Sequence, residues 1–537
     1  MIPRFAQPSG KTLIKYLSVA WLVLSGVGPV SAQITAFKQA VAEAASGSEG
    51  VSAFYRESGY KPIWTGQDDL SMARRAALFD ALSFADLHGL PQDRYNIESL
   101  KAQMAGVRSV RDLGQVEAAL SQIFVTYARD LQSGFIKPST IDKDIVRKIT
   151  RPAPGVLLSD FSTAKPSAYL RGLAPASAQY RALLKEKITL EELLATGGWG
   201  LSVPVRKMKR GDTGRDVIAL RNRLVTMGYL GRTATSQYDS SIQKAVESFQ
   251  QAHGLEVDGV AGTGTIKEIN KSVADRLKSV IVALERERWL PRERGKRHIL
   301  VNQTDFSAQI VDEGYVTFQT RSVIGKNVEG RRTPEFSDVM EHMVINPSWY
   351  VPRSIITKEY LPKLRANPNA VSHIEITDSR GRRVNRGAVN FSNYSAKTFP
   401  FSMRQPPSKR NALGLVKFIF PNKHNIYLHD TPQKHLFARE VRAYSHGCIR
   451  LSQPFEFAYA LLAHQEENPK DYFHSVLNTG TETKVPLKTQ LPVHIIYRTA
   501  LITNTGKAEF RKDIYGRDAK IWEAMRRAGV ALSAVQG

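Results

Sequence analysis

The residues best suited to chemistry are the only cysteine among the 537 residues and the histidines near it. Cys448 follows His446 and Gly447 in the stretch Tyr444 to Arg450 (YSHGCIR), and another histidine, His429, lies upstream. A thiolate is a nucleophile that a histidine can activate, and backbone N–H groups beside a glycine can stabilise an oxyanion. A cysteine without an intramolecular disulfide partner is, in an exported chain, either an intermolecular partner or a reactive group. These residues indicate thiolate catalysis.

The residues alone leave open which histidine is the base. A free cysteine has a pKa of about 8.5, so the thiolate needs a base or a cation nearby. His446 lies two residues before Cys448, and on one strand such side chains point the same way without the ring reaching the sulfur well. His429 ends a predicted strand elsewhere in the chain. Gly447 permits a tight turn in which its own N–H and that of Cys448 face an oxyanion.

Two other uses of these side chains are a buried structural thiol and a zinc site. A structural role is the usual one for an isolated cysteine. A zinc site would combine Cys448 with histidines, but neither an H-E-x-x-H motif nor a paired C-x-x-C accompanies them. We therefore predict no metal and no cofactor. The histidines in question are His424, His429, His435 and His446.

The N-terminus has the pattern of an export signal. Arg4, Lys11 and Lys15 precede a short apolar run, Leu17 to Val27, and small residues before Ala32 suit a cleavage site. An uncleaved anchor is the alternative, but the run is shorter than the ~20 residues of a membrane span. We predict a signal peptide at residues 1–32, a periplasmic location and no transmembrane segment in the mature chain.

The formal charge of +25 limits the kinds of molecule that the protein is expected to bind. Strongly basic proteins bind nucleic acid, anionic lipid or anionic polymers, and export argues against nucleic acid. The cell wall, whose peptide stems carry carboxylates, and the membrane surface remain, as does a role in solubility alone. With 42% hydrophobic and 23% charged residues, the chain has the composition of a globular protein.

Helical patterns fill the first part of the mature chain. Apolar residues recur at helical spacing from Leu78 to Ala85 and from Val116 to Leu131, and Gly134 ends the second run. These segments predict a helical scaffold domain at residues 33–200, in which no catalytic group of residues is recognisable. A Gly-rich connector follows at 197–204.

A compact three-helix unit is predicted at residues 208–272. Asp239 caps its second helix, and Gly228 and Gly254 end its first two helices. The unit resembles the peptidoglycan-binding domain 1 family, which implies binding to wall glycan or stem peptide; a spacer without ligand is the alternative. The matching residues are Gly211, Gly214, Asp216, Val217, Leu220, Leu224, Gly228 to Leu230, Ala245, Val246, Phe249, Gln250, His253 to Leu255, Asp258 and Gly259.

Residues 280–500 predict a mainly β domain after a helix at Val273 to Arg288. Short β-branched runs alternate with turns, and Pro454 begins a helix after the cysteine strand. The strand pattern breaks at residues 353–404, an insert that we interpret as a lid over the site, with a surface excursion as the alternative. The C-terminal extension, residues 501–537, is expected to pack on this domain. The fold class is therefore α+β multidomain.

The spacing of His429 and Cys448 resembles the catalytic motif of the L,D-transpeptidase (YkuD-type) family. Fifteen residues separate His429 from Ser445-His446-Gly447-Cys448. The resemblance extends over most of the mature chain and matches the large, scaffold-bearing members. Flanking stretches that share it are Arg286 to Pro291 (RERWLP), Asn346 to Trp349, Val351-Pro352, Gln405-Pro406, Asn411 to Gly414, Lys417-Phe418 and Tyr427 to Pro432 (YLHDTP).

The resemblance implies a role for each residue of the motif. Cys448 is the nucleophile, His429 the general base, and the backbone at His446 and Gly447 shapes the oxyanion turn. Tyr427, Ser445 and Arg450 are expected to contact substrate, although Arg450 stands where many members have asparagine and can instead brace the turn.

The implied reaction is acyl transfer between peptidoglycan stem peptides, linking the third residues of neighbouring stems. Water, a lysine of an outer-membrane protein or a free D-amino acid are alternative acceptors. A non-catalytic wall scaffold is the alternative outside enzymology. The resemblance also implies that carbapenems acylate Cys448.

Overall fold

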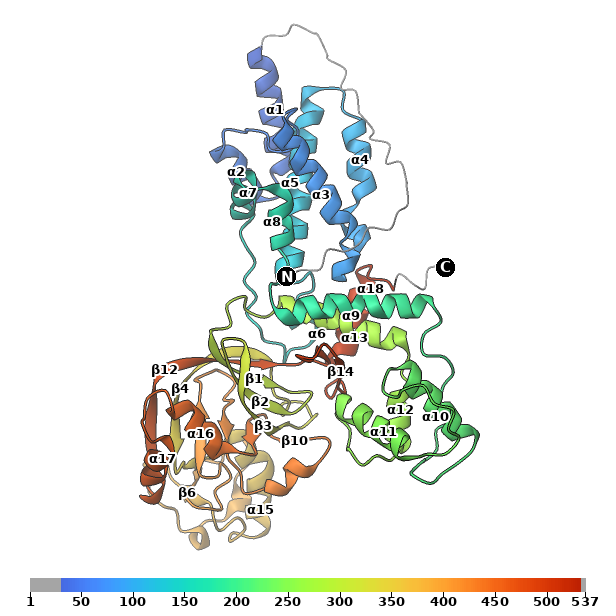
Figure 1. Cartoon of the computed structure of the whole chain (residues 1–537). Helices are drawn as coiled ribbons and strands as arrows, with labels where there is room; N and C mark the ends of the chain where they lie inside the picture. The colour runs from blue at the N-terminus through green and yellow to red at the C-terminus, as the bar shows by residue number, and fades with distance from the viewer. Residues whose placement is uncertain (1–29, 533–537) are drawn as a thin grey trace. The chain divides into compact units, whose positions relative to one another are not determined.

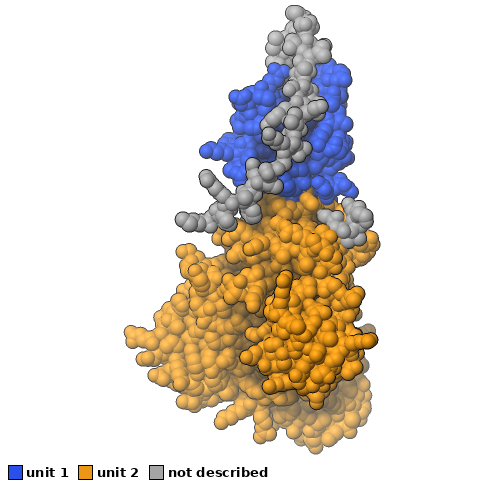
Figure 2. All heavy atoms as spheres, turned by 45° about the vertical axis from the view of Figure 1, so that its right-hand side comes forward, with its two compact units in different colours: residues 1–84, 92–128, 152–171 blue, residues 85–91, 129–151, 172–537 orange. Residues whose placement is uncertain are grey.

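A computed structural model describes residues 30–532, so most of the predicted signal peptide lies outside the described residues. The chain forms two compact units (Figure 2). The first consists of residues 1–84, 92–128 and 152–171, and the second of residues 85–91, 129–151 and 172–537. The predicted α+β multidomain class is confirmed. Within residues 30–532, no helix combines the length and the apolar character that crossing a membrane requires.

The first unit is helical. Trp64 stacks on Phe161 with ring centroids 5.1 Å apart, and Phe124 packs against both rings. The buried carboxylate of Glu117 accepts hydrogen bonds from the N–H groups of Ile63 at 2.7 Å and Thr65 at 2.8 Å, which fixes the loop between α2 and α3. The helices are α1 (Val30–Ala45), α2 (Glu49–Glu57), α3 (Asp69–Ser83), α4 (Ile97–Ala105), α5 (Val110–Ser133), α7 (Pro154–Thr163) and α8 (Pro166–Gly172), with a 3-10 turn at Gln92–Tyr95; the last residues of α5 and of α8 lie in the second unit.

The three-helix module in the second unit contains α10 (Arg215–Thr226), α11 (Ser240–Ala252) and α12 (Thr263–Ile269). Apolar side chains of all three helices form one buried cluster. Asp239 accepts hydrogen bonds from the N–H groups of Ser241 at 2.9 Å and Ile242 at 3.0 Å, as expected for a helix cap.

Two long helices, α9 (Ala178–Ala195) and α13 (Val273–Arg288), lie side by side (Figure 1) and share a buried cluster with the C-terminal segment. Helix α9, which lies within the predicted scaffold range 33–200, is part of the second compact unit, where it packs on α13. The C-terminal segment consists of the hairpin β13 (Ala500–Ile502) and β14 (Ala508–Phe510), followed by α18 (Arg517–Arg527). The short helix α6 (Pro138–Ile141) and a 3-10 turn at Asp86–His88 complete the helices of this region.

The last turn of α13 buries four charged side chains, Glu285–Arg288. Buried charges require partners, and each of the four has at least one. Arg288 pairs with Glu285 at 2.7 Å on the helix itself. The other pairs join α13 to the rest of the second unit: Arg286 with Glu335 and Asp518, and Glu287 with Arg294 and Arg498.

The mainly β region predicted at 280–500 contains a nine-stranded mixed sheet in the order β10-β3-β11-β9-β8-β4-β12-β1-β2. A further pairing of β2 with β3 joins the strands from β3 to β2 into a ring. Helices α16 (Pro454–Leu462) and α17 (Pro469–Asn478) pack on its core. The strands are β1 (Arg297–Asn302), β2 (Ser307–Asp312), β3 (Tyr315–Gly325), β4 (Phe336–Ile345), β8 (Val416–Ile419), β9 (Leu428–His429), β10 (Ala443–Ser445), β11 (Ile449–Leu451) and β12 (Thr483–Ile496), with a 3-10 turn at Lys434–Ala438.

The insert is a folded subdomain. It has its own buried apolar cluster, in which Phe391 is 1% and Leu364 is 0% exposed, and a three-stranded sheet in the order β5-β7-β6. The subdomain begins with β5 (Trp349–Tyr350) and ends with β7 (Ser402–Gln405), so it extends a few residues beyond the predicted bounds of 353–404. Between these strands lie α14 (Arg353–Ile355), a π-helical turn at Ile356–Tyr360, α15 (Leu361–Ala366), β6 (Glu375–Thr377) and 3-10 turns at Arg386–Ala388 and Phe391–Asn393.

Candidate active site

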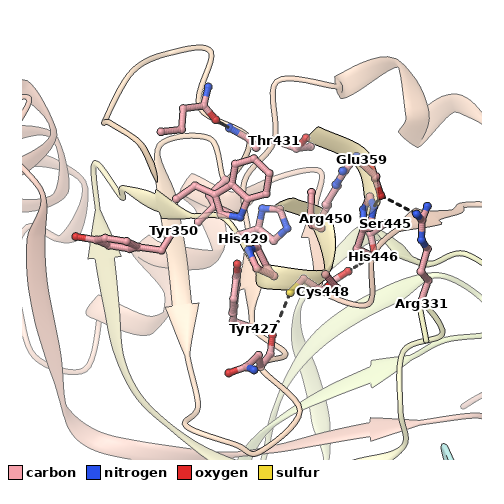
Figure 3. Close-up of a pocket in the computed structure, with 18 of the residues that line it drawn as sticks. Arg331, Tyr350, Glu359, Tyr427, His429, Thr431, Ser445, His446, Cys448 and Arg450 are labelled. Carbon is pink, nitrogen blue, oxygen red and sulfur yellow. Dashed lines mark hydrogen bonds and ion pairs between the residues drawn. The ribbon is translucent and has the colours of Figure 1, made fainter. Parts of the chain in front are cut away.

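Two neighbouring strands bring the predicted site residues together. β9 and β11 pair in parallel, with Ile449 opposite Leu428 and Arg450 opposite His429. Side chains alternate between the faces of a strand, so the apolar residues Leu428 and Ile449 enter the core and leave the opposite face to polar residues. The residues that line the pocket on this opposite face are Tyr427, His429, Cys448 and Arg450 (Figure 3).

The pocket has a volume of about 780 Å³. Strands β9 and β11 and the turn before Cys448 form one side of it. The insert contributes another wall through Ile355, Glu359 and Tyr360. The insert therefore limits the space in which a substrate can approach the cysteine.

His429 is buried and neutral in this pocket. Its Nδ1 atom contacts the carbonyl oxygen of Asp430, and because a carbonyl only accepts, Nδ1 carries the proton. Burial lowers the pKa of His429 to about 3, and the charge of Arg450 adds to this, while the carbonyls of Asp430 and Leu413 act in the opposite direction. In this tautomer the lone pair is on Nε2.

Cys448 is partly accessible, and its Sγ lies 3.4 Å from the carbonyl oxygen of Asn425. Burial raises the pKa of the Cys448 thiol to about 11, although Tyr427 and the charge of Arg450 favour the thiolate. At neutral pH the pocket is therefore lined by a thiol and a neutral imidazole. A nucleophile in this state must lose its proton as it attacks.

The turn from Ser445 to Cys448 requires glycine. Gly447 has φ 125°, and an added Cβ would lie 3.1 Å from Ile426 Cδ1. Its N–H donates to Ser445 Oγ at 3.1 Å, so this group is already engaged, in contrast to the oxyanion contact expected from the sequence. Within residues 30–532, the N–H groups of His446 and Cys448 have no hydrogen-bond acceptor.

Ser445 is buried and belongs to the same turn. Its hydroxyl donates to the carbonyl of Cys448 at 2.5 Å while it accepts from Gly447. Both hydroxyl contacts therefore stay inside the turn. The substrate contact expected for Ser445 from the sequence stays a prediction, and the hydrogen bonds observed for this hydroxyl hold the turn.

Arg450 bonds to a neighbouring loop through one N–H group, and its Nε–H group takes no part in that bond. Its Nη1 donates to Gln433 Oε1 at 2.6 Å. Its Nε is buried and, in the described part of the chain, has no hydrogen-bond acceptor. The two roles expected from the sequence, brace and substrate contact, are thus compatible in one side chain.

Two residues that the sequence did not single out, Glu359 of the insert and Arg331, lie next to the turn. Glu359 Oε1 lies 2.6 Å from His446 Nε2 and 2.6 Å from Arg331 Nη2 (Figure 3). Burial raises the pKa of the Glu359 carboxyl, but the hydrogen bond from His446 and the charges of His446 and Arg331 bring it below its ordinary value. No spacing rule in the sequence connects these three positions.

The described residues contain no group of three or more histidine, cysteine or acidic side chains arranged to hold a metal ion. The imidazoles of His429 and His446 have other partners, as described above. The chemistry available in the pocket is that of a thiol, an imidazole and backbone N–H donors.

Comparisons with known proteins assign domains along the chain. Residues 296–495 match the L,D-transpeptidase catalytic domain, residues 213–269 match a "Putative peptidoglycan binding domain", and residues 49–186 match a Scaffold domain. A curated relative from Haemophilus influenzae, named "Putative L,D-transpeptidase", is 35% identical over 227 residues. This match covers 42% of the chain and 45% of the relative, so the chain spans less than half of the relative's length.

Two solved structures give weak global alignments. The L,D-transpeptidase from Xylanimonas cellulosilytica aligns with 54% of this chain and 98% of its own, at 16% identity and a TM-score of 0.17. A fused Zn-dependent amidase/peptidase/peptidoglycan-binding protein from Clostridium acetobutylicum aligns with 54% of this chain and 99% of its own, at 13% identity and a TM-score of 0.15. TM-scores this low carry no structural argument, and the assignment rests on the sequence matches. The chain therefore contains a catalytic domain of the L,D-transpeptidase family, together with a peptidoglycan-binding domain and a scaffold domain.

Proposed function

We propose that this protein is a peptidoglycan L,D-transpeptidase that works through a thioester on Cys448. The observation that carries the proposal is the pairing of β9 with β11, which sets the only thiol of the chain and a buried neutral imidazole on one face of one pocket. A nucleophile, a base with a free lone pair and two open N–H donors are what acyl transfer needs.

In the first half-reaction, Cys448 Sγ attacks the carbonyl that joins the third residue of a tetrapeptide stem to D-alanine. His429 Nε2 takes the thiol proton and delivers it to the departing amine. The S–C bond forms, the C–N bond breaks, and D-alanine leaves. Because the thiol and the imidazole are both neutral at rest, proton transfer accompanies the attack.

The oxyanion of each tetrahedral intermediate is stabilised by the N–H groups of His446 and Cys448. Donors directed at the developing charge contribute more than donors that already bond the ground state. The Gly447 N–H, which bonds Ser445, holds the turn in shape. Tyr427 and Arg450 line the pocket and supply the contacts to the stem peptide.

In the second half-reaction, the side-chain amine on the third residue of a neighbouring stem attacks the thioester. The C–N bond forms, the C–S bond breaks, and the proton released by the amine returns through His429 to the sulfur. Water competes with the amine at this stage. The insert at 353–404 acts as a lid that limits water access, since it forms a wall of the pocket.

The remaining parts of the chain hold the catalytic domain at its substrate. The module at 208–272 binds wall polymer, and residues 1–32 direct export to the periplasm. Stem peptides and glycan are the partners, with a lysine of an outer-membrane protein as a further acceptor. The basic charge of the chain favours contact with the carboxylates of the stems.

The test is to incubate the purified protein with tetrapeptide muropeptides and to identify the products by mass spectrometry. We expect D-alanine, a cross-linked dimer and an acyl adduct on Cys448, and we expect none of these with Cys448→Ala. Tripeptide without dimer would make the protein an L,D-carboxypeptidase, and exchange of added D-amino acids would identify a third acceptor. Absence of both product and adduct would refute the enzyme proposal. A carbapenem should add its mass to the wild type alone.

A further inference from the structure

We propose that the C-terminal segment is a positioning element for the oxyanion turn and acts on it through Thr333. The inference rests on the proposed function, because it concerns the N–H of Cys448 in the acyl-transfer steps. Thr333, Tyr515 and Arg517 touch neither the thiol nor the imidazole. Their contacts instead fix the direction of the peptide group that ends at the nucleophile.

Thr333 holds the carbonyl of Gly447. Its side chain is fully buried, and its hydroxyl donates to Gly447 O at 2.6 Å while it accepts from the N–H of Gly325 at 2.9 Å. A hydroxyl has one proton to donate, so the Gly325 contact directs that proton to Gly447. In this hydrogen bond Thr333 is therefore the donor and Gly447 the acceptor.

The Gly447 carbonyl and the Cys448 N–H belong to one peptide group. A trans peptide is planar, with its C=O and N–H pointing in opposite directions. Fixing the carbonyl on Thr333 thus fixes the direction of the Cys448 N–H, which has no acceptor within residues 30–532. Glycine has no side chain of its own to limit the backbone at φ 125°, so hydrogen bonds must hold this peptide group. The Thr333 contact does so together with the Ser445 hydroxyl, which bonds the Gly447 N–H and the Cys448 carbonyl.

Residues of the C-terminal segment hold the backbone of Thr333 on both sides. The Tyr515 hydroxyl accepts from the Thr333 N–H at 3.3 Å and donates to Gly325 O at 2.6 Å. Arg517 Nη2 donates to Thr333 O at 3.0 Å. The same segment therefore fixes both Thr333 and the Gly325 residue that orients its hydroxyl.

Buried charges fix Arg517 in turn. Its side chain is 0% exposed, and its Nη1 lies 3.1 Å from Glu335 Oε1. Glu335 also pairs with Arg286 of α13 at 2.9 Å, and Arg286 Nε pairs with Asp518 at 2.6 Å. The charged turn of α13, which the reaction itself does not use, thereby anchors the start of α18 beside the catalytic turn.

The test compares Thr333→Val with Thr333→Ser in the full chain. Valine keeps the shape and removes the hydroxyl, whereas serine keeps the donor. Thr320→Val is the matched control, because Thr320 on β3 is 3% exposed and its hydroxyl accepts from the N–H of Gln453, away from the turn. We expect Thr333→Val to lower kcat for D-alanine release about tenfold, less than loss of a direct oxyanion donor, with little change in KM. Thr333→Ser should restore most of the rate.

A second readout separates positioning from general damage. Alkylation of Cys448 by iodoacetamide forms no oxyanion, so Thr333→Val should leave its rate unchanged. Tyr515→Phe removes the hydroxyl between Thr333 and Gly325 and should give a smaller loss of kcat, again without effect on alkylation.

Three outcomes would overturn the positioning role. They are an unchanged kcat in Thr333→Val, a fall in kcat matched by Thr320→Val, and a parallel loss of alkylation and thermal stability. If the wild type itself releases no D-alanine, the proposed function fails and the positioning role falls with it. An active wild type with an equally active Thr333→Val refutes positioning alone.

Discussion

The protonation states of Cys448 and His429 make a quantitative prediction for His429→Gln and for the effect of pH. At pH 8, a thiol with a pKa of about 11 has about 200-fold less thiolate than an exposed cysteine with a pKa of about 8.5. The more basic thiolate is intrinsically more nucleophilic, and this raises the alkylation rate by roughly tenfold, which offsets part of the loss. We therefore expect iodoacetamide to alkylate folded Cys448 about 20-fold more slowly than the same chain unfolded in urea.

The sign of the pH dependence follows from the direction of the two shifts. The thiol pKa is raised and the imidazole pKa is lowered, so between pH 6 and 9 the pair is neutral and the alkylation rate should rise about tenfold per pH unit. His429→Gln should leave this profile in place, because the imidazole carries no charge there, and should reduce D-alanine release by about 10²–10⁴-fold.

The assay is intact-mass spectrometry, and the single cysteine makes the adduct unambiguous. Alkylation that is already fast and independent of pH near neutrality would refute the reasoning, since it would indicate a thiolate–imidazolium pair. Faster alkylation of the folded than of the unfolded chain would do the same.

Three further predictions concern the turn and the insert. Gly447→Ala should lower the free energy of unfolding by about 1–2 kcal/mol, because alanine is strained at φ 125°, and should slow D-alanine release at least about tenfold. Thermal unfolding and D-alanine release measure the two effects, and wild-type values for both would contradict the prediction. Glu359→Gln removes the carboxylate that His446 and Arg331 share. Because Glu359 is partly exposed, we expect the variant to lose less than about 1 kcal/mol of stability. We also expect more of the thioester to be hydrolysed by water, which the ratio of tripeptide to dimer measures. Phe391→Ala should lower the local stability of the insert by about 3–5 kcal/mol. Hydrogen exchange should then be faster at 353–404, while the protection of β12 stays unchanged. Exchange that rises equally in both regions would show that the insert has no separate apolar cluster.

Local sequence patterns were enough to predict many elements. The helix expected at about Val273 to Arg288 is α13, and in the structure Ser272 caps its first turn. The apolar, β-branched residues Val493 to Tyr497 predict a strand, but the observed strand β12 begins ten residues earlier, at Thr483. Pro486 and Pro492 argue against a strand, but the register shifts between Pro486 and Leu491 and accommodates the interruption.

The candidate site likewise has a part that the sequence predicted and a part that it did not. The motif spacing is a local pattern, and it predicted that Cys448 and His429 belong to one site. Contacts that depend on the fold of distant segments leave no such pattern. Glu359 meets His446 across 87 residues and Thr333 meets Gly447 across 114, and neither spacing corresponds to a helix or strand period. The supporting residues were therefore recognisable only from the structure.

The place of β12 in the sheet sets the order in which the catalytic domain can fold. Of the nine strands it is the last in the sequence, yet it lies between β4 and β1, with Val493 opposite Ile299. Pairings between such distant segments form slowly, because the entropy of closing the chain is lost before the contacts form. The ring of strands stays open until residues 483–496 have been synthesised and inserted. A fragment cut between β11 and β12 would thus carry the whole His429–Cys448 motif on a sheet that cannot close.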